Sequence, residues 1–200
     1  MPEKSHDLHG SAPDTSPVAL LLIDVINDLD FDGGEDLLNQ ALPAARRIAE
    51  LKRRAKAAGV PAIYVNDNFG RWQSDFQSLI EHVLKDGGRG RGLAQLLRPE
   101  EDDYFILKPK HSGFYSTTLD LLLRHLGVRR LILTGFAGNI CVLFTANDAF
   151  LRDYHLLVPS DCTASNTREA NEQALSLMRT VLKAETTSSA EIDLDALIFA

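Results

Sequence analysis

Apolar runs and amphipathic stretches alternate along the chain from residue 18 onward. Residues 18–23 form a short, continuous apolar run, which is typical of a strand buried on both faces of a sheet. A stretch with helical periodicity follows, and it predicts a helix that ends at Gly59, a residue type common just after helices. Its apolar positions are Leu38, Leu42, Ala45, Ile48, Ala49 and Leu51. A second strand is predicted at residues 62–65.

The same alternation continues toward the C-terminus. Further strands are predicted at residues 104–107, 130–135 and 155–158, with a last edge strand at 190–194. Helices are predicted at residues 72–85, 117–126, 140–151 and 168–184, and the glycine-rich residues 86–92 are expected to form a loop. Repeated β–α alternation indicates an α/β fold, in which a doubly wound, mostly parallel sheet carries helices on both faces.

The chain length of 200 residues fits one domain, which we expect to span residues 17–200. Residues 1–16 are polar and are interpreted as a flexible N-terminal tail, because they lack the apolar segment of a signal peptide. No apolar run is long enough to cross a membrane. We therefore expect a cytoplasmic protein with no membrane partner.

The charge balance and the cysteine content exclude several classes of function. Lysine and arginine number 21 against 28 acidic residues, so the net charge of −7 argues against a nucleic-acid partner. Two cysteines, Cys141 and Cys162, are too few for a disulfide framework. The histidines and cysteines lack the spacing of metal ligands, and no GxGxxG fingerprint is present, so we expect neither a metal nor a cofactor.

Three residues with possible chemistry follow predicted strands, where ligands bind in parallel sheets. Asp24 is a candidate general base or a turn cap, and Lys108 is its candidate partner or a solvated lysine. Cys141 is a candidate nucleophile or a buried apolar side chain. Its position at the start of a helix favours the thiolate, which predicts a lowered pKa. Cys162 has no basic neighbour in sequence and is predicted to pack in the core.

These residues lie in three motifs that resemble the isochorismatase-like cysteine hydrolases, a family that includes nicotinamidases and N-carbamoylsarcosine amidases. The motifs are LLIDVIND at residues 21–28, KPKHSGFYST at 108–117 and LTGFAGNICV at 133–142. The resemblance implies a six-stranded parallel sheet and a catalytic triad of Asp24, Lys108 and Cys141. It also implies a cis peptide bond between Phe136 and Ala137, an oxyanion hole formed by the backbone N–H groups of Ala137 and Cys141, and assembly into a homodimer or homotetramer.

The resemblance further implies hydrolysis of an amide or related C–N bond of a small molecule through a thioester. Hydrolysis of a vinyl ether C–O bond, as in isochorismatases, is one alternative, and a catalytically idle binding or scaffold protein on this fold is another. Residues 66–72 replace the nicotinamidase metal ligands, which argues against a bound metal. The segment at 66–75 is either a lid or an ordinary surface loop. The expected substrate pocket is lined by Ile26, Asn68, Trp72, Phe114 and Phe136.

Overall fold

A computed structural model describes residues 15–69, 75–85 and 87–199. Six parallel strands form one sheet in the order β3-β2-β1-β4-β5, and β6 pairs with β4 beyond the end of β5. The strands are β1 (Val18–Ile23), β2 (Ala62–Asp67), β3 (Tyr104–Lys108), β4 (Arg130–Phe136), β5 (His155–Leu157) and β6 (Thr163–Ala164). The predicted α/β fold with a doubly wound, six-stranded parallel sheet is confirmed.

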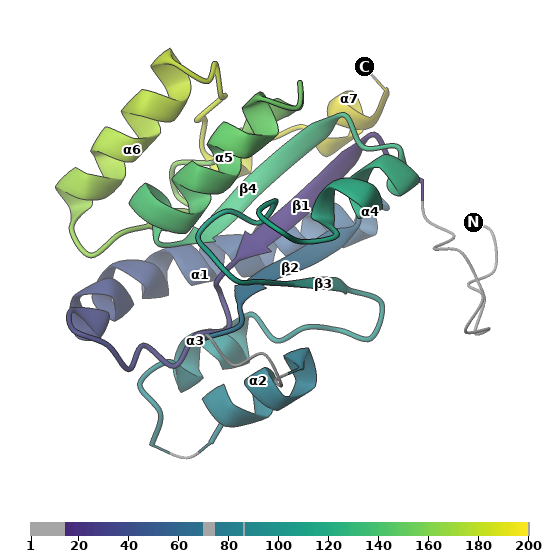
Figure 1. Cartoon of the computed structure of the whole chain (residues 1–200). Coiled ribbons are helices and arrows are strands. Elements are labelled where there is room, and N and C mark those ends of the chain that lie inside the picture. Colours follow the sequence, from purple (N-terminus) through teal and green to yellow (C-terminus); the bar gives the residue numbers. More distant parts are fainter. Residues whose placement is uncertain (1–14, 70–74, 86, 200) are drawn as a thin grey trace.

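Helices cover both faces of this sheet (Figure 1). One face carries the long helix α1 (Gly34–Ala57) together with α2 (Phe76–Val83), α3 (Arg91–Leu96) and the C-terminal segment. The other face carries α4 (Leu119–Leu126), α5 (Leu143–Phe150) and α6 (Arg168–Thr180). A five-residue π-helix, η1 (Gly138–Val142), connects β4 to α5. A short 3₁₀ turn, η2 (Ser189–Glu191), and α7 (Leu194–Phe199) end the fold.

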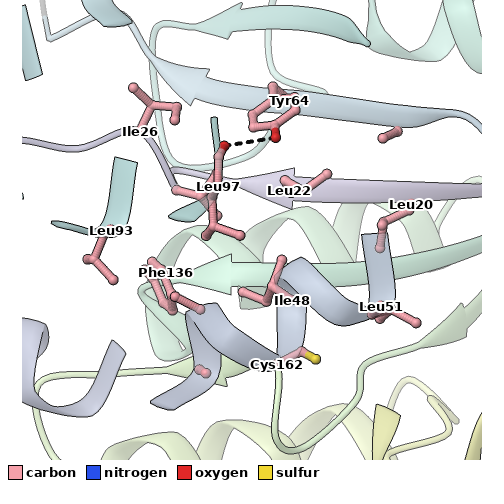
Figure 2. Packing of buried hydrophobic residues seen from close by; sticks show 14 of the residues in the cluster. Leu20, Leu22, Ile26, Ile48, Leu51, Tyr64, Leu93, Leu97, Phe136 and Cys162 are labelled. Atoms are coloured by element: carbon pink, nitrogen blue, oxygen red, sulfur yellow. Dashed lines mark hydrogen bonds between the residues drawn. The ribbon is translucent and has the colours of Figure 1, made fainter. Parts of the chain in front are cut away.

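Strand β1 lies at the centre of the sheet, and all six of its residues are buried. Leu20 and Leu22 point toward α1, where they pack in one apolar cluster with Tyr64 and Phe136 (Figure 2). The Tyr64 hydroxyl donates a hydrogen bond to the carbonyl oxygen of Leu97 at 2.9 Å, so its polar tip is satisfied inside the cluster. Ala19, Leu21 and Ile23 face the other cluster, under α4 and α5. Burial on both faces explains why this strand is a continuous apolar run.

The C-terminal part of the fold differs from the sequence prediction. Residues 190–194, predicted as an edge strand, comprise the end of η2, two residues outside any element and the first residue of α7, and the sixth strand is β6. β6 has only two residues, too few to produce a hydrophobic pattern. The predicted loop at 86–92 is also partly wrong, because α3 begins at Arg91. Local periodicity does not distinguish such short elements.

The N-terminal boundary lies slightly earlier than predicted. Residues 1–14 of the predicted tail lie outside the described residues. Ser16, the last residue of that tail, is buried, and its backbone N–H donates to the carbonyl oxygen of Leu126 at 2.9 Å. Its hydroxyl also donates to the carbonyl oxygen of Val18 at 2.8 Å. The packed structure therefore includes residue 16. No helix among the described residues is long and apolar enough to cross a membrane.

Candidate active site

The three predicted catalytic residues meet at the carboxyl-terminal edge of the sheet. Asp24 directly follows β1, Lys108 is the last residue of β3, and Cys141 lies in η1 after β4. β2 separates β3 from β1, so the Lys108 backbone lies about 10 Å across the sheet from Asp24. The long lysine side chain spans this gap. Because β1 and β4 are adjacent, the strand order brings the nucleophile candidate to the other side of Asp24.

Lys108 links the site together. Its side chain is fully buried, and its Nζ lies 2.8 Å from Asp24 Oδ2 and 3.5 Å from Cys141 Sγ. Asp67 Oδ2, on the neighbouring strand, lies 3.6 Å from the same nitrogen. Burial lowers the pKa of Lys108, but its interactions with neighbouring acidic groups, above all the Asp24 carboxylate, outweigh that effect and raise the pKa above its usual value. The lysine is therefore a permanent cation that holds the two groups around it.

Asp24 is an almost completely buried carboxylate. Its Oδ1 accepts a hydrogen bond from the backbone N–H of Asp67 at 2.6 Å, and its Oδ2 pairs with Lys108. Burial raises the pKa of Asp24, and the Lys108 cation only partly opposes this because desolvation of the carboxylate is the larger effect. A carboxylate with a raised pKa is a stronger base, which fits a group that takes a proton from a thiol.

Cys141 is half-buried and interacts with both charged partners, by hydrogen bonding as well as by charge. Burial raises the pKa of its thiol, the Asp24 carboxylate raises it further, and Lys108 only partly offsets the two. The lowered pKa predicted from the helix start is therefore wrong. The cysteine lies inside a π-turn beside a buried carboxylate, and ionising it with Asp24 charged places two anions against one ammonium. The resting thiol keeps its proton.

The turn that carries Cys141 has the backbone features that the family resemblance implies for an oxyanion hole. The peptide bond between Phe136 and Ala137 is cis, at the position that the family resemblance implies. The N–H of Ile140 and that of Val142 both donate to the carbonyl oxygen of Ala137, at 3.1 and 3.2 Å. The N–H groups of Ala137 and Cys141 belong to the same turn, at its start and beside the thiol. Two backbone donors beside a nucleophile are what an oxyanion hole requires.

The predicted pocket residues are distributed differently. Ile26 and Phe136 are buried in the cluster under α1, and Phe114 packs on the opposite face with Arg152 above its ring. These three side chains belong to the core, because apolar residues beside buried strands fill the space under the covering helices. Asn68 is buried, and its backbone N–H donates to the carbonyl oxygen of Lys108 at 3.0 Å. Trp72 lies outside the described residues, as do residues 70–74 of the predicted lid at 66–75.

Two polar contacts join the loop after β3 to the helix that follows the nucleophile, and the sequence prediction did not include them. Thr145 Oγ1 accepts from the backbone N–H of Gly113 at 3.0 Å and donates to the carbonyl oxygen of Cys141 at 2.7 Å. Ser112 Oγ donates to Asp148 at 2.5 Å. Ser112 and Gly113 lie within the motif at 108–117, and Thr145 and Asp148 follow the motif at 133–142, but their pairing depends on tertiary structure. The remaining cysteine, Cys162, is buried in the α1 cluster, as predicted.

No group of three or more histidine, cysteine or acidic side chains is placed to hold a metal ion within residues 15–69, 75–85 and 87–199. The Asp24 and Asp67 carboxylates both lie against the Lys108 ammonium, at 2.8 and 3.6 Å from its Nζ. The lysine therefore supplies a positive charge to both carboxylates.

Comparisons with known proteins show relatives over most of the chain. The family model described as the isochorismatase domain matches residues 18–191. The chain is 45% identical over 174 residues to the isochorismatase family protein YaaI of Bacillus subtilis, covering 87% of this chain and 95% of YaaI. It is 32% identical over 174 residues to the ureidoacrylate amidohydrolase RutB of Yersinia enterocolitica, covering 74% of this chain and 76% of RutB.

A solved structure supports the same relationship. The crystal structure of N-carbamoylsarcosine amidase from Thermoplasma acidophilum superimposes with a TM-score of 0.67 at 27% sequence identity. The superposition covers 88% of this chain and 98% of the amidase. The similarity therefore extends over most of the chain.

Proposed function

Because the chain belongs to the isochorismatase family, we propose that it is a hydrolase that cleaves an amide or related C–N bond of a small molecule through Cys141. The observation that carries the proposal is a buried lysine whose Nζ lies 2.8 Å from a buried carboxylate and 3.5 Å from a thiol. The backbone N–H groups of Ala137 and Cys141 lie in the same turn as the thiol. This set supplies a nucleophile, a base and an oxyanion site.

In the proposed first half-reaction, the Asp24 carboxylate takes the proton from the Cys141 thiol as the sulfur attacks the carbonyl carbon of the substrate. The carbonyl oxygen becomes an oxyanion, which accepts hydrogen bonds from the N–H groups of Ala137 and Cys141. The C–N bond then breaks, and protonated Asp24 gives its proton to the departing nitrogen. The acyl group remains on the sulfur as a thioester.

In the second half-reaction, water attacks the thioester carbon while Asp24 again accepts the proton. The C–S bond breaks, the sulfur recovers a proton from Asp24, and the acid product leaves. Lys108 stays charged throughout, as expected from its raised pKa. Its role is to hold Asp24 near the sulfur and to balance the negative charge that passes between the two groups.

The names of two relatives support a particular substrate range. RutB is a ureidoacrylate amidohydrolase, and the Thermoplasma protein is an N-carbamoylsarcosine amidase. Both names describe substrates with a carbonyl group between nitrogen atoms. We therefore propose that ureido and carbamoyl compounds belong in the substrate range of this chain, beside simple primary amides.

An ammonia-release screen tests this function. The purified protein is incubated with primary amides, ureido acids and N-carbamoyl amino acids, and ammonia is measured against the Cys141→Ala variant on each compound. The expected result is release from at least one compound by the wild type and none by the variant. Turnover that survives in Cys141→Ala would instead favour a reaction carried by Asp24 and water, as in vinyl ether hydrolysis.

The acid side of the pH profile follows from the state of Asp24. Turnover requires the carboxylate, and burial raises its pKa above the usual value of about 3.9. The kcat/KM is therefore expected to fall with decreasing pH through a midpoint above about 4. On the alkaline side, the raised pKa values of Cys141 and Lys108 predict no loss below about pH 9. The measurement is kcat/KM from pH 3.5 to 9.5 at constant ionic strength.

Reassay at neutral pH after incubation at each test pH distinguishes titration from irreversible unfolding. An acid midpoint at or below about 4 would contradict the role of a buried Asp24 as the base.

A further inference from the structure

The backbone of the nucleophile turn is tied to α6 by a chain of hydrogen bonds. The N–H of Asn139 donates to Ser165 Oγ at 3.0 Å, and Ser165 Oγ donates to Asn171 Oδ1 at 3.2 Å. The amide nitrogen of Asn171 donates to both the carbonyl and the hydroxyl oxygen of Thr163, each at 3.3 Å. These hydrogen bonds therefore connect η1 to α6 through the residues at the end of β6. The three elements also pack against one another. In Figure 1, α6 lies beside α5 at the outer side of the sheet.

A close approach accompanies these bonds. Gly138 is buried, and a Cβ at this position would overlap Asn171 Oδ1 and lie 3.2 Å from Ser165 Oγ. Only glycine lets the turn come this near to the two side chains. Ser165 is itself fully buried, so its hydroxyl has no solvent as an alternative partner.

The anchored N–H group lies between the two that would form the oxyanion hole. Asn139 comes two residues after Ala137 and two residues before Cys141, and its own N–H is bonded to Ser165 Oγ. Fixing the peptide in the middle therefore limits the rotation of both neighbours. An oxyanion hole contributes most when its donors are held in place before the charge develops, since they then need no reorganisation.

We propose that Ser165 and Asn171 are positioning residues that aim the N–H groups of Ala137 and Cys141 at the developing oxyanion. This inference rests on the proposed function and adds two residues outside the triad to it. Ser165 holds the turn directly, and Asn171 orients the Ser165 hydroxyl while its own amide is held by Thr163. Neither side chain has a hydrogen bond to the thiol among the described residues. Their replacement should therefore weaken the stabilisation of the oxyanion and leave the reactivity of the thiol unchanged.

Two reactions of Cys141 distinguish these effects. Amide hydrolysis passes through an oxyanion, whereas alkylation by iodoacetamide transfers charge from sulfur to a departing iodide and forms no oxyanion. Ser165→Ala and Asn171→Ala are expected to lower kcat by about 10- to 100-fold, because small displacements of positioned groups have effects of this size. The alkylation rate of Cys141 should stay within about threefold of the wild type, because both variants leave Asp24 and Lys108 in place. KM should change less than kcat.

Thr167→Ala is the matched control. Thr167 caps α6, and its Oγ accepts from the backbone N–H of Ala170 at 3.1 Å, so its loss loosens the helix that carries Asn171 without touching the hydrogen-bond chain. Its kcat should remain near that of the wild type. The double variant Ser165→Ala/Asn171→Ala should be no slower than the slower single variant, because the two residues act in series.

Hydrogen exchange of the segment 136–143 gives a readout that needs no substrate. Exchange in this segment should increase at least about tenfold in Ser165→Ala, while strand β1 stays unchanged. If the wild type hydrolyses no amide, the proposed function fails and the exchange result alone decides the positioning role. Unchanged exchange in Ser165→Ala, equal losses of turnover and alkylation, or a kcat loss of the same size in Thr167→Ala would overturn the inference.

Discussion

Replacement of Cys141 with alanine is expected to lower kcat by at least about 10⁴-fold while the protein remains folded. The sulfur is the only atom of the site that can form the thioester, and no neighbouring hydroxyl or thiol is bonded to Asp24 or Lys108 in the described residues. Cys141 is half-buried and lies at the edge of the core. Its truncation should therefore change the free energy of unfolding by only about 1 kcal/mol.

The control for this prediction is the second cysteine. Cys162 is completely buried against the α1 cluster, and burial raises the pKa of its thiol to about 12. Cys162→Ala should lower stability through lost packing, by about 1 kcal/mol, and leave kcat unchanged. The measurements are ammonia release and thermal unfolding of both variants. Residual turnover above about 1% in Cys141→Ala would exclude the sulfur as the nucleophile.

Replacement of Asp24 with asparagine is expected to have opposite effects on turnover and on thiol reactivity. Without a base, kcat/KM should fall by about 10²- to 10⁴-fold. The Asp24 carboxylate raises the pKa of the Cys141 thiol, so its neutralisation should lower that pKa and speed alkylation by iodoacetamide near pH 8. Lys108 then acts on the sulfur without an opposing carboxylate on Asp24.

Asp28→Asn is the matched control, because it removes the same charge from the same loop. Asp28 pairs with His82 at 3.1 Å and does not contact the triad, so both rates should stay near those of the wild type. Far-ultraviolet circular dichroism establishes that Asp24→Asn is folded, which is expected because Asp67 still lies 3.6 Å from the Lys108 ammonium. Slower alkylation in Asp24→Asn would contradict the coupling between the carboxylate and the thiol.

The central strands and their end residues were predictable because each depends on local pattern. A strand buried on both faces is mostly apolar, so residues 18–23 and the apolar centre of 130–135 are evident in the sequence, and the first polar residue after an apolar run marks the sheet edge. This is why Asp24 and Lys108 were found. The motif after β4 identified Cys141 because the resemblance is specific over several residues.

Other features were not predictable because they depend on short elements or on contacts distant in sequence. β6 has two residues, yet it leads directly into Ser165, which holds the nucleophile turn. Three of the expected pocket residues, Ile26, Phe114 and Phe136, are apolar beside buried strands, and their sequence positions do not distinguish a pocket wall from a core. The homo-oligomeric state and the cytoplasmic location stay predictions.

The sequence by itself determined the α/β class, the order of the main elements and the identity of the three residues at the strand ends. Only the tertiary structure decided how these residues act on one another. Lys108 reaches Asp24 across an intervening strand. Burial beside that carboxylate raises the pKa of Cys141, whereas a position at the start of a helix alone predicts a lowered pKa. The reason is physical: apolar periodicity is a local property, whereas desolvation and charge coupling depend on which strand ends the folded sheet places together.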